Sequence, residues 1–428
     1  MRILIISYYF SPDTTVAADR AYGFAQSLAS AGHQVTVLTS APESNFSADF
    51  NVVNIPNKFF VLIKKFFSFF SEEVQTNKGT TKSQTTSFFS GIINRFNQFR
   101  KSKGILFLGR MPDLADFWYL SAFNWIKQQP KWDVVMASYA PYSNLLLALK
   151  TKKQNLANYF IADFRDPWID HHLFSGLPLI SMMELRLFKK ICNNTDHITT
   201  ATPTLSKLIN KQSGQHCITI LNGAVVLKSS APSLPFSLPS DELLIIHTGS
   251  IYTHMQSIDP FFTALKDLKA THTFKVCFAG NEKEHIQSLI SKYQLENHVY
   301  HLGFLNKSNC RHLIEIADIC LSFDLNNQSF PGIIPVKLIE YMAHNKNILF
   351  CYEHIDSDAA SMLEKYNNKE TTPYNTRDLT RALNRLYQTS SLTTKNMQYF
   401  RDYQNIDLVD LISNLNKNTK NENSPRSK

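Results

Sequence analysis

The segment FPGIIPVKLIEYMAHNKNILF, residues 330–350, contains a turn, a helix and a strand in the order found in α/β proteins. A Pro-Gly pair opens it, and Pro335 follows where a helix would begin, a place where proline's missing N–H and fixed φ cost nothing. Residues 336–344 then predict a helix, and residues 348–350 a strand. Such a helix presents free N–H groups and a partial positive charge to the preceding loop, which suits an anion.

Two charged residues of this helix, Lys337 and Glu340, are three positions apart and therefore share a face. A lysine at the start of a helix fits a phosphate, and a carboxylate one turn later fits the hydroxyls of a sugar. A surface Lys–Glu pair on an ordinary amphipathic helix has the same pattern. This segment alone leaves both interpretations open.

The N-terminus predicts a βαβ unit that begins with the first residues. Residues 2–7 form an apolar run, residues 16–31 place apolar side chains at helical spacing, and Gly32 separates them from a β-branched run at 34–39. MRILIISYYF lacks the charged region and cleavage site of a signal peptide, so we expect a strand there.

Strands and helices alternate along the rest of the chain, before and after a segment with three prolines and five serines at 228–241. This pattern predicts an α/β fold of two Rossmann-like, doubly wound domains facing a cleft, with ligands at the carboxyl ends of the strands. The predicted parts are an N-terminal domain 1–227, a linker 228–241, a C-terminal domain 242–393, a helical segment 394–415 that packs back on the N-terminal domain, and a disordered tail 416–428.

The composition is that of a soluble globular protein, with 428 residues, 43% hydrophobic and 18% charged. No run approaches the roughly 18 apolar residues of a membrane span. Six cysteines are scattered without CxxC spacing, which argues against a zinc site or a disulfide framework and fits a reducing cytoplasm.

The formal net charge of +9 is unevenly distributed, because residues 57–110 contain ten Lys or Arg and two Glu. Residues 59–67 carry seven aromatic or aliphatic side chains around Lys64 and Lys65. Short, apolar and basic helices suit an anionic membrane surface, so we expect a membrane-facing insertion at 57–110. A helix packed inside the N-terminal domain is the alternative. A nucleic-acid surface ranks last, because the charges lie beside Phe and Leu clusters.

The sequence ADFRDPW places three charged residues directly after an apolar strand. Asp163, Arg165 and Asp166 would thereby stand at the mouth of the cleft as candidate catalytic residues. An Arg–Asp pair that braces the loop is the alternative. His171 and His172 are further acid/base candidates, although adjacent histidines on a loop are more often incidental.

Taken in order, these segments resemble retaining glycosyltransferases of the family-4 type, which have the GT-B architecture of two Rossmann domains. The resemblance runs from the MRILIISYYF opening and the GHQVTVLT second strand to PVKLIEYMAHNKNIL. DFRDPW-like and PxKLxEY-like segments make it most similar to members from bacterial surface-polysaccharide clusters. The resemblance implies a nucleotide-sugar donor held mainly by the C-terminal domain.

It also implies roles for residues around the helix at 336–344. Glu340 matches the second glutamate of an E-x7-E motif, which holds the nucleotide ribose, but Gly332 stands where the first glutamate should be. Pro335, Lys337 and Leu338, at the start of this helix, would face the diphosphate.

The remaining implied contacts to the donor lie at strand ends. Gly249 and Ser250 belong to a loop whose backbone approaches the phosphates, a role suited to glycine. Family members follow this loop with an Arg and a Lys, whereas IYTHMQS offers only His254. Gly280 would line the cleft and Gly303-Phe304 would meet the base, with a plain strand-ending turn as the alternative for each glycine. On the opposite domain, Thr14 and Thr15 would approach the phosphates, and Arg165-Asp166 stand about where many members have a His-Asp pair that contacts sugar hydroxyls.

We therefore expect an enzyme that transfers a sugar, with retention, from a UDP- or GDP-sugar to a lipid-linked glycan in capsule, O-antigen or exopolysaccharide synthesis. The resemblance implies no cofactor and no metal, and the placement of the basic residues beside Phe and Leu clusters argues against a nucleic-acid partner. It places the protein in the cytoplasm, peripheral at the inner face of the plasma membrane. Two alternatives remain open. One is a sugar-nucleotide epimerase. The other is a degenerate, non-catalytic scaffold of a polysaccharide complex. The scaffold remains an alternative because Gly332 replaces the expected glutamate and the expected Arg and Lys are missing.

Overall fold

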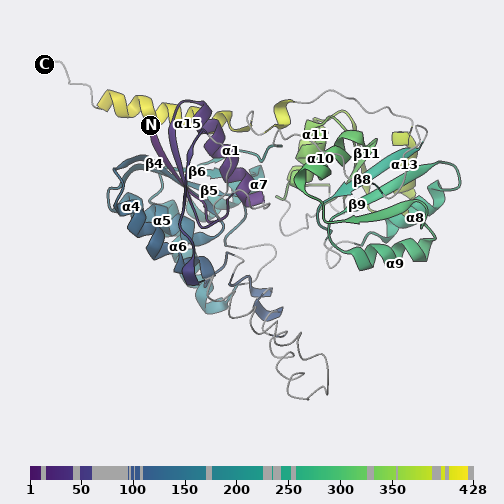
Figure 1. Cartoon of the computed structure of the whole chain (residues 1–428), viewed down its shortest axis with the longest axis horizontal. Coiled ribbons are helices and arrows are strands. Elements are labelled where there is room, and N and C mark those ends of the chain that lie inside the picture. The colour runs from purple at the N-terminus through teal and green to yellow at the C-terminus, as the bar shows by residue number, and fades with distance from the viewer. Residues whose placement is uncertain are drawn as a thin grey trace, which may run out of the picture. The chain divides into compact units, whose positions relative to one another are not determined.

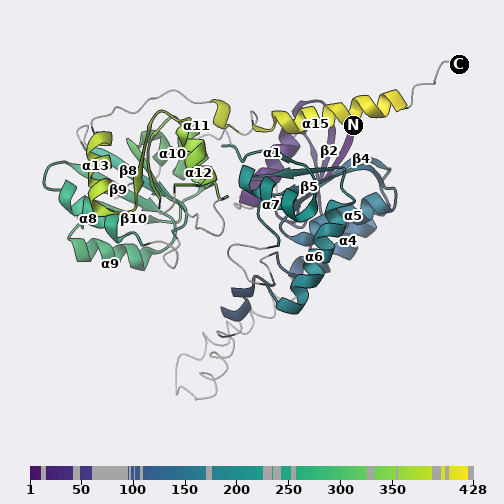
Figure 2. The same cartoon turned by 180° about the vertical axis from the view of Figure 1, so that it is seen from behind.

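The computed structural model describes residues 1–10, 16–41, 49–59, 95, 98–100, 102–106, 109–169, 176–224, 234, 242–251, 257–324, 332–352, 355–387, 397–400 and 404–422. The chain forms two compact units, Met1–Leu221 together with Asn405–Lys428, and Asn222–Gln404. Each unit has its own parallel sheet with helices around it (Figure 1, Figure 2). Most of the expected linker, 228–241, lies outside the described residues.

The first unit contains a seven-stranded sheet in the order β3-β2-β1-β4-β5-β6-β7, and its strand pairs are parallel. The strands are β1 (Arg2–Ile6), β2 (Gln34–Thr39), β3 (Asn51–Asn54), β4 (Trp132–Tyr139), β5 (Ala157–Phe164), β6 (His197–Thr200) and β7 (Cys217–Thr219). The helices are α1 (Val16–Ser30), the 3-10 helix η1 (Leu114–Phe117), α4 (Tyr119–Lys127), α5 (Tyr142–Lys153), α6 (Pro178–Cys192), α7 (Pro203–Ser213) and α15 (Ile406–Glu422).

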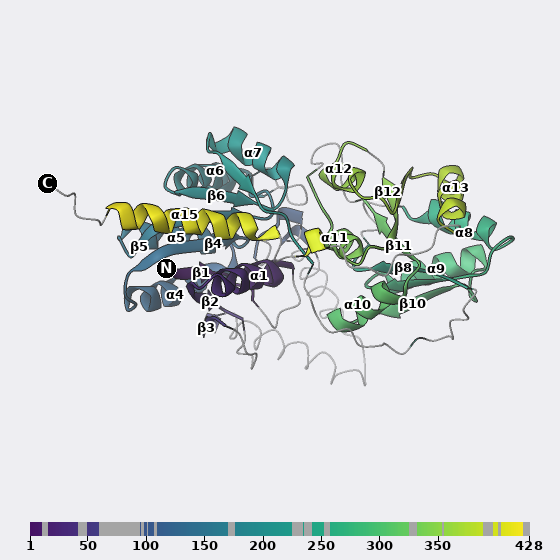
Figure 3. The ribbon, with the colours of Figure 1, turned by 90° about the horizontal axis from the view of Figure 1, so that it is seen from above.

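The last helix, α15, packs in the core of the first unit. Leu408, Ile412 and Leu415 are spaced to share one face, and they join Phe24 and Leu28 of α1 in a buried cluster. Figure 3 shows α15 running beside α1. We expected disorder from residue 416, but α15 continues to Glu422. These buried side chains anchor the first part of the helix. Extending a helix that is already formed costs little free energy, because nucleation is the unfavourable step.

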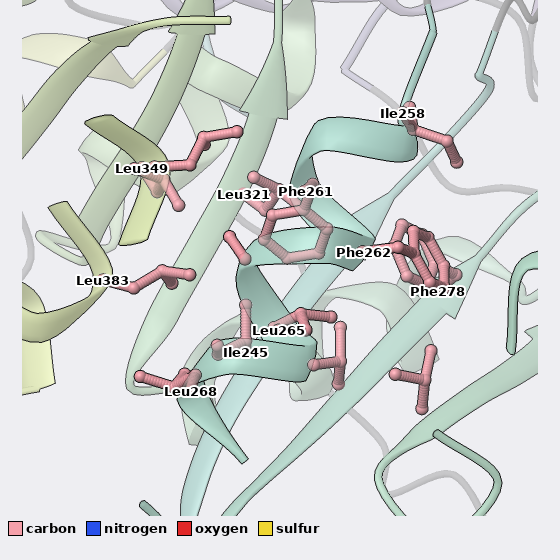
Figure 4. Packing of buried hydrophobic residues seen from close by; sticks show 14 of the residues in the cluster. Ile245, Ile258, Phe261, Phe262, Leu265, Leu268, Phe278, Leu321, Leu349 and Leu383 are labelled. Carbon is pink, nitrogen blue, oxygen red and sulfur yellow. The ribbon is translucent and has the colours of Figure 1, made fainter. Parts of the chain in front are cut away.

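The second unit contains a six-stranded sheet in the order β10-β9-β8-β11-β12-β13, also with parallel pairs. The strands are β8 (Leu243–Thr248), β9 (Phe274–Ala279), β10 (Val299–Gly303), β11 (Ile319–Phe323), β12 (Asn347–Tyr352) and β13 (Lys369–Pro373). The helices are α8 (Asp259–Leu268), α9 (Lys283–Tyr293), α10 (Lys307–Ile316), α11 (Val336–Ala343), α12 (Asp358–Glu364), α13 (Thr376–Tyr387) and the 3-10 helix η2 (Met397–Tyr399). Phe261 and Leu265 of α8 pack with Leu383 of α13 and with Ile245 and Leu321 of the sheet (Figure 4).

These two sheets confirm the predicted α/β fold with two Rossmann-like domains. In each, the strand order reverses at a central pair, β1/β4 or β8/β11, which makes the sheet doubly wound. The strand predicted at 34–39 has these bounds in the structure. The edge strands β3 and β13 were missed, because NVVN and KETTP carry little of the apolar signal that marks a central strand.

Most of the expected membrane-facing insertion, 57–110, lies outside the described residues. Both of its ends, however, are buried in the first unit. Asn57 donates a hydrogen bond to the Leu114 carbonyl at 2.9 Å, and Arg110 forms an ion pair with Glu184 at 2.7 Å. The predicted insertion is therefore too long at both ends. Within the described part of the chain, no helix combines the length and apolar character needed to cross a membrane.

The carboxylate of Asp163 is buried inside the first unit and ties β5 to three neighbouring elements. It accepts hydrogen bonds from Arg20 of α1 at 2.7 Å, from Ser138 of β4 at 2.7 Å and from Thr199 of β6 at 2.8 Å. The side chains of Arg20 and Asp163 are 1% and 0% exposed. The expectation that Asp163 stands at the mouth of a cleft is wrong, because this end of β5 is buried on both faces and neighbouring elements enclose the carboxylate.

Replacing Asp163 by Asn should destabilise the first unit by about 3–5 kcal/mol, because it leaves the Arg20 guanidinium buried without a counter-charge. All four tryptophans, at 118, 125, 132 and 168, belong to this unit, so their fluorescence in a urea titration reports its unfolding. Asp166→Asn is the control, with an expected change below about 0.5 kcal/mol because that carboxylate is exposed. Equal stability of the two variants would contradict a structural role for Asp163.

Candidate functional site

The carboxyl edge of the second sheet brings three of the candidate glycines together on adjacent strands. Gly249 follows β8, Gly280 follows β9, and Gly303 ends β10. The Gly249 N–H donates to the Ala279 carbonyl at 2.8 Å, and the Gly280 N–H donates to the Gly303 carbonyl at 2.9 Å. Doubly wound sheets bind ligands at this edge, next to the strands where the order reverses, which here are β8 and β11.

Position 280 has no room for a side chain. A Cβ built on Gly280 would lie 2.1 Å from the Gly249 carbonyl oxygen, a backbone atom. Gly249 has a φ of 94°, a conformation that glycine adopts without steric cost. The turn itself therefore requires glycine at both positions. This agrees with the alternative interpretation, in which each glycine serves only a strand-ending turn. Because glycine has no side chain, only backbone atoms line the carboxyl edge of the sheet at these two positions. A phosphate could therefore approach the backbone closely there.

Tyr341 ties helix α11 to the end of β8. Its buried hydroxyl accepts a hydrogen bond from the Thr248 N–H at 3.0 Å and lies 3.0 Å from the Thr248 hydroxyl. Burial raises the pKa of Tyr341, so the hydroxyl stays protonated. This contact fixes the register of α11 against the strand that leads into the Gly249 loop.

Lys337 extends from the first turn of α11 to the same loop. Its Nζ lies 2.9 Å from Nε2 of His247 and 3.4 Å from the Ser250 carbonyl oxygen. A Cβ on Gly249 would stand 3.8 Å from this Nζ. Burial lowers the pKa of Lys337 from 10.5 to about 7. The structure therefore brings together Lys337, Gly249 and Ser250, three of the candidate residues, and adds His247.

The other candidates on this helix have different surroundings. Leu338 is fully buried and its N–H donates to the Pro335 carbonyl at 3.0 Å, so its side chain belongs to the core and faces no ligand. Pro335 is the N-cap residue of α11, in agreement with the predicted helix start. The partly exposed carboxylate of Glu340 lies 4.0 Å from the guanidinium of Arg311 on α10. Lys337 and Glu340 thus contact different partners.

Phe304, the candidate for contact with the base, follows Gly303 and is 84% exposed. An exposed aromatic ring offers a flat face for stacking. Gly332, at the place of the missing glutamate, is buried. Five candidates lie outside the described residues: Thr14, Thr15, His171, His172 and His254. Across the described residues, no group of three or more His, Cys, Asp or Glu side chains is placed to hold a metal ion.

In the first unit, Arg165 and Asp166 form the bracing pair that the sequence left as an alternative. Arg165 Nε donates to the Tyr139 carbonyl at 3.1 Å and lies 3.8 Å from the Asp166 carboxylate. Asp166 is still 43% exposed. Trp168 is buried, and its ring stacks with those of Tyr139 and Tyr142 at centroid distances of 5.6 and 5.5 Å. Most of the DFRDPW segment therefore stabilises the domain.

Sequence reasoning missed His247 and Tyr341. Both stand in apolar runs, IIHTGS and LIEYMA, where a ring is easily taken for part of the core. A signal was present for His247, because a histidine inside a buried strand needs hydrogen-bond partners. The identity of those partners depends on tertiary contacts, since Lys337 is ninety positions away.

Residues 235–399, which lie inside the second unit, match the family model for glycosyl transferases group 1. No curated protein matches the chain by sequence. Among solved structures, the chain is similar to sucrose-phosphate synthase from Thermosynechococcus elongatus, with a TM-score of 0.57 and 12% identity over 98% of this chain and 99% of that chain.

Two further solved structures are similar over nearly the whole chain. HepE from Anabaena, in complex with UDP and glucose, has a TM-score of 0.53 and 13% identity over 99% of both chains. The lipopolysaccharide outer core galactosyltransferase WaaB has a TM-score of 0.53 and 11% identity over 96% of this chain and 100% of that chain. At these identities the likeness shows a shared fold. Together with the group 1 match, this fold supports a glycosyltransferase with the GT-B fold.

Replacing Gly280 by Ala should destabilise the second unit by about 3 kcal/mol, because the new Cβ meets the backbone of Gly249. Gly303→Ala is the matched control. Its Cβ would have no atom within 4 Å, so only the positive φ costs energy, about 1 kcal/mol. The second unit contains no tryptophan, so its unfolding is followed by far-UV circular dichroism while the tryptophan transition should stay unchanged. Equal effects of the two variants would show that position 280 is not sterically restricted.

Proposed function

We propose that the protein is a retaining glycosyltransferase that moves a sugar from a UDP- or GDP-sugar to a lipid-linked glycan. The observation that carries this proposal is the position of Lys337, on the first turn of α11, beside the Gly249 loop inside the segment that matches glycosyl transferases group 1. When the bond between sugar and diphosphate breaks, negative charge develops on the leaving diphosphate. A lysine, a helix N-terminus and backbone N–H groups are preorganised partners for that charge.

The other contacts of the donor follow from this placement of the diphosphate. Glu340, one turn further along α11, would accept hydrogen bonds from the ribose hydroxyls, with Arg311 beside it. The exposed ring of Phe304 would stack on the base. We propose no cofactor and no metal ion, since Lys337 and the start of α11 would meet the diphosphate. HepE, which shares the fold, was solved with UDP and glucose, and this makes UDP the first nucleotide to test.

In retention, the acceptor hydroxyl attacks the sugar on the face from which the diphosphate leaves. The acceptor oxygen forms the new bond to the sugar carbon, the bond between sugar and diphosphate breaks, and the proton of the hydroxyl passes to the leaving diphosphate oxygen. In the first unit, the exposed carboxylate of Asp166 is the proposed contact to a sugar hydroxyl, with Arg165 as its brace. Asp163 is excluded from this role by its burial.

An epimerase and a non-catalytic scaffold are the alternatives. An epimerase converts the donor alone, so NMR spectra taken without an acceptor would show a second nucleotide-sugar. A scaffold would fold normally and bind no nucleotide. The contact between the partly buried Lys337 and the buried His247 favours a working anion site, because withdrawing an amine from water without a counter-charge costs free energy that an anionic ligand would recover.

We further propose that the protein acts in the cytoplasm at the inner face of the plasma membrane, in surface-polysaccharide synthesis. The six cysteines are scattered along the sequence without CxxC spacing, a pattern that fits a reducing compartment. Helix α6 has exposed apolar side chains beside exposed basic ones, and Leu179 is 87% exposed. The set is Leu179, Met182, Met183, Arg186, Lys189 and Lys190. Such a surface suits an anionic bilayer that carries the lipid-linked acceptor.

Calorimetric titration with UDP, GDP and ADP tests the donor site. We expect one of the uridine or guanosine nucleotides to bind, and Lys337→Ala to weaken its binding at least tenfold, because a hydrogen bond to a charged group contributes about 1.5–3 kcal/mol. Glu340→Ala should weaken binding as well, through the ribose. Lys365→Ala is the control, because Lys365 is an exposed lysine of the same unit. A wild-type protein that folds but binds none of the three would contradict the transferase and favour the scaffold.

Sedimentation with vesicles of phosphatidylglycerol and phosphatidylcholine tests the membrane surface. The triple variant Leu179→Ser, Met182→Ser, Met183→Ser should bind at least tenfold more weakly, because each apolar side chain that enters the bilayer contributes on the order of 1 kcal/mol. The control is the double variant Ile355→Ser, Ile406→Ser, which changes exposed apolar residues on other elements. Unchanged binding of the triple variant would exclude α6 as the contact.

A further inference from the structure

Lys337 and His247 form a hydrogen bond whose direction is fixed by chemistry. His247 Nδ1 lies 3.1 Å from the Leu321 carbonyl oxygen, and because a carbonyl only accepts, Nδ1 carries the ring proton. Nε2 therefore has a free lone pair. Lys337 Nζ, 2.9 Å away, donates to it, and the Ser250 carbonyl is a second acceptor at 3.4 Å.

The imidazole of His247 is held in a single orientation. The residue is 1% exposed on β8, and its ring packs against Phe278 of β9 and Phe323 of β11 at centroid distances of 5.8 and 5.4 Å. A proton on Nε2 would place a second buried positive charge next to the lysine. Burial, together with the charge of Lys337, holds the pKa of His247 well below 6.5. The pair therefore carries at most one positive charge, and that charge sits on Lys337.

Within the described residues, Lys337 takes part in no ion pair, and the ionisable groups on the elements around it have other contacts. Glu340 of α11 lies beside Arg311 of α10. Asp324, after β11, accepts from Ser357 at 3.3 Å, and the Tyr341 hydroxyl contacts Thr248. Lys337 is partly buried, and an amine withdrawn from water without a counter-charge favours its neutral form, so desolvation lowers the pKa of Lys337 to about 7.

We propose that His247 is a positioning residue that aims the Lys337 amine at the diphosphate of the donor, and that binding of the diphosphate transfers one proton from solvent to this amine. The identity of the ligand rests on the proposed function. The proton adds to the lone pair of Nζ, and no other bond forms or breaks. The diphosphate supplies the counter-charge that the empty site lacks, so the ammonium form is stable while the ligand is bound.

Donor binding should therefore weaken as the pH rises. Below pH 7 the amine of the free protein already carries its proton, and the ligand meets a charged site. Above pH 7 each binding event must first take up a proton. With a pKa of about 7, the protonated fraction falls about tenfold between pH 6 and pH 8, and the affinity falls with it.

Calorimetric titration of the full chain with UDP-glucose and GDP-mannose measures this linkage. Both ligands are diphosphate diesters whose charge is constant between pH 6 and pH 8, so a change in affinity belongs to the protein. We expect about tenfold weaker binding at pH 8 than at pH 6. At pH 8 the binding enthalpy should also change with the ionisation enthalpy of the buffer, as uptake of a proton requires.

Three variants separate positioning from general stability. Lys337→Arg keeps its charge throughout this pH range, so the buffer-dependent heat should vanish. His247→Asn keeps a donor for Leu321 but removes the acceptor for Lys337. Its affinity should fall about tenfold, and the midpoint of its pH dependence should move to lower pH, because a hydrogen bond to the ammonium favours the charged form. In His247→Gln the amide oxygen replaces Nε2 as the acceptor. This variant should recover most of the affinity and reverse most of the shift in the midpoint of the pH dependence.

The outcomes distinguish this inference from the function on which it rests. If the wild-type protein binds with an affinity that is independent of pH and an enthalpy that is independent of the buffer, the proposed proton uptake is wrong. The proposed function would be unaffected by that result. Equal affinity of wild type and His247→Asn would overturn the positioning role. No binding of either ligand at pH 6 would contradict the proposed function, and the inference with it.

Discussion

The candidate site depends on the pairing of buried polar groups where β8 meets α11. The Thr248 N–H and the His247 ring are both buried at the end of β8. Leaving such a group without a partner costs about 1–3 kcal/mol. The Tyr341 hydroxyl and the Leu321 carbonyl supply the partners, so α11 is held with its first turn at the Gly249 loop. The position of Lys337 is thus a consequence of satisfying the backbone and the ring around it.

Arg20 is buried in the first unit and Lys337 is partly buried in the second, and the two side chains have different kinds of partner. Arg20 meets Asp163, whose oxygens also accept from Ser138 and Thr199, so this charge is fully compensated inside the fold. A compensated pair of this kind stabilises the domain, and neither of its charges is available to bind a ligand. Lys337 has a neutral imidazole and a carbonyl instead, which orient the amine without neutralising it. A site that lacks its counter-charge is suited to an anion brought by a substrate.

The two sheets could be predicted from the sequence because strand and helix periodicities are local, and the proline before α11 marked the helix start. Other features depended on more than local pattern. Asp163 was placed at the mouth of a cleft, but both faces of β5 are covered at this end, so all side chains from Phe160 to Phe164 are buried. The edge strand β13 has no apolar alternation to reveal it. The partner of Lys337 lies ninety positions upstream, so no local pattern could identify it.

Two sequence differences from the family that this chain resembles bear on the charge of the candidate site. Gly332 stands where the resembled family has a glutamate, and the segment after Ser250 lacks the usual Arg and Lys. The proposed diphosphate would therefore meet fewer positive charges in that segment. A permanently charged arginine in place of Lys337 would need a counter-ion in the empty site. A lysine whose pKa is about 7 avoids that cost, because it is partly neutral when the site is empty and would be charged with the proposed diphosphate bound. With the proposed proton uptake, each pH unit above 7 would remove about 1.4 kcal/mol from the free energy of donor binding, so the proposed site would bind best at or below neutral pH.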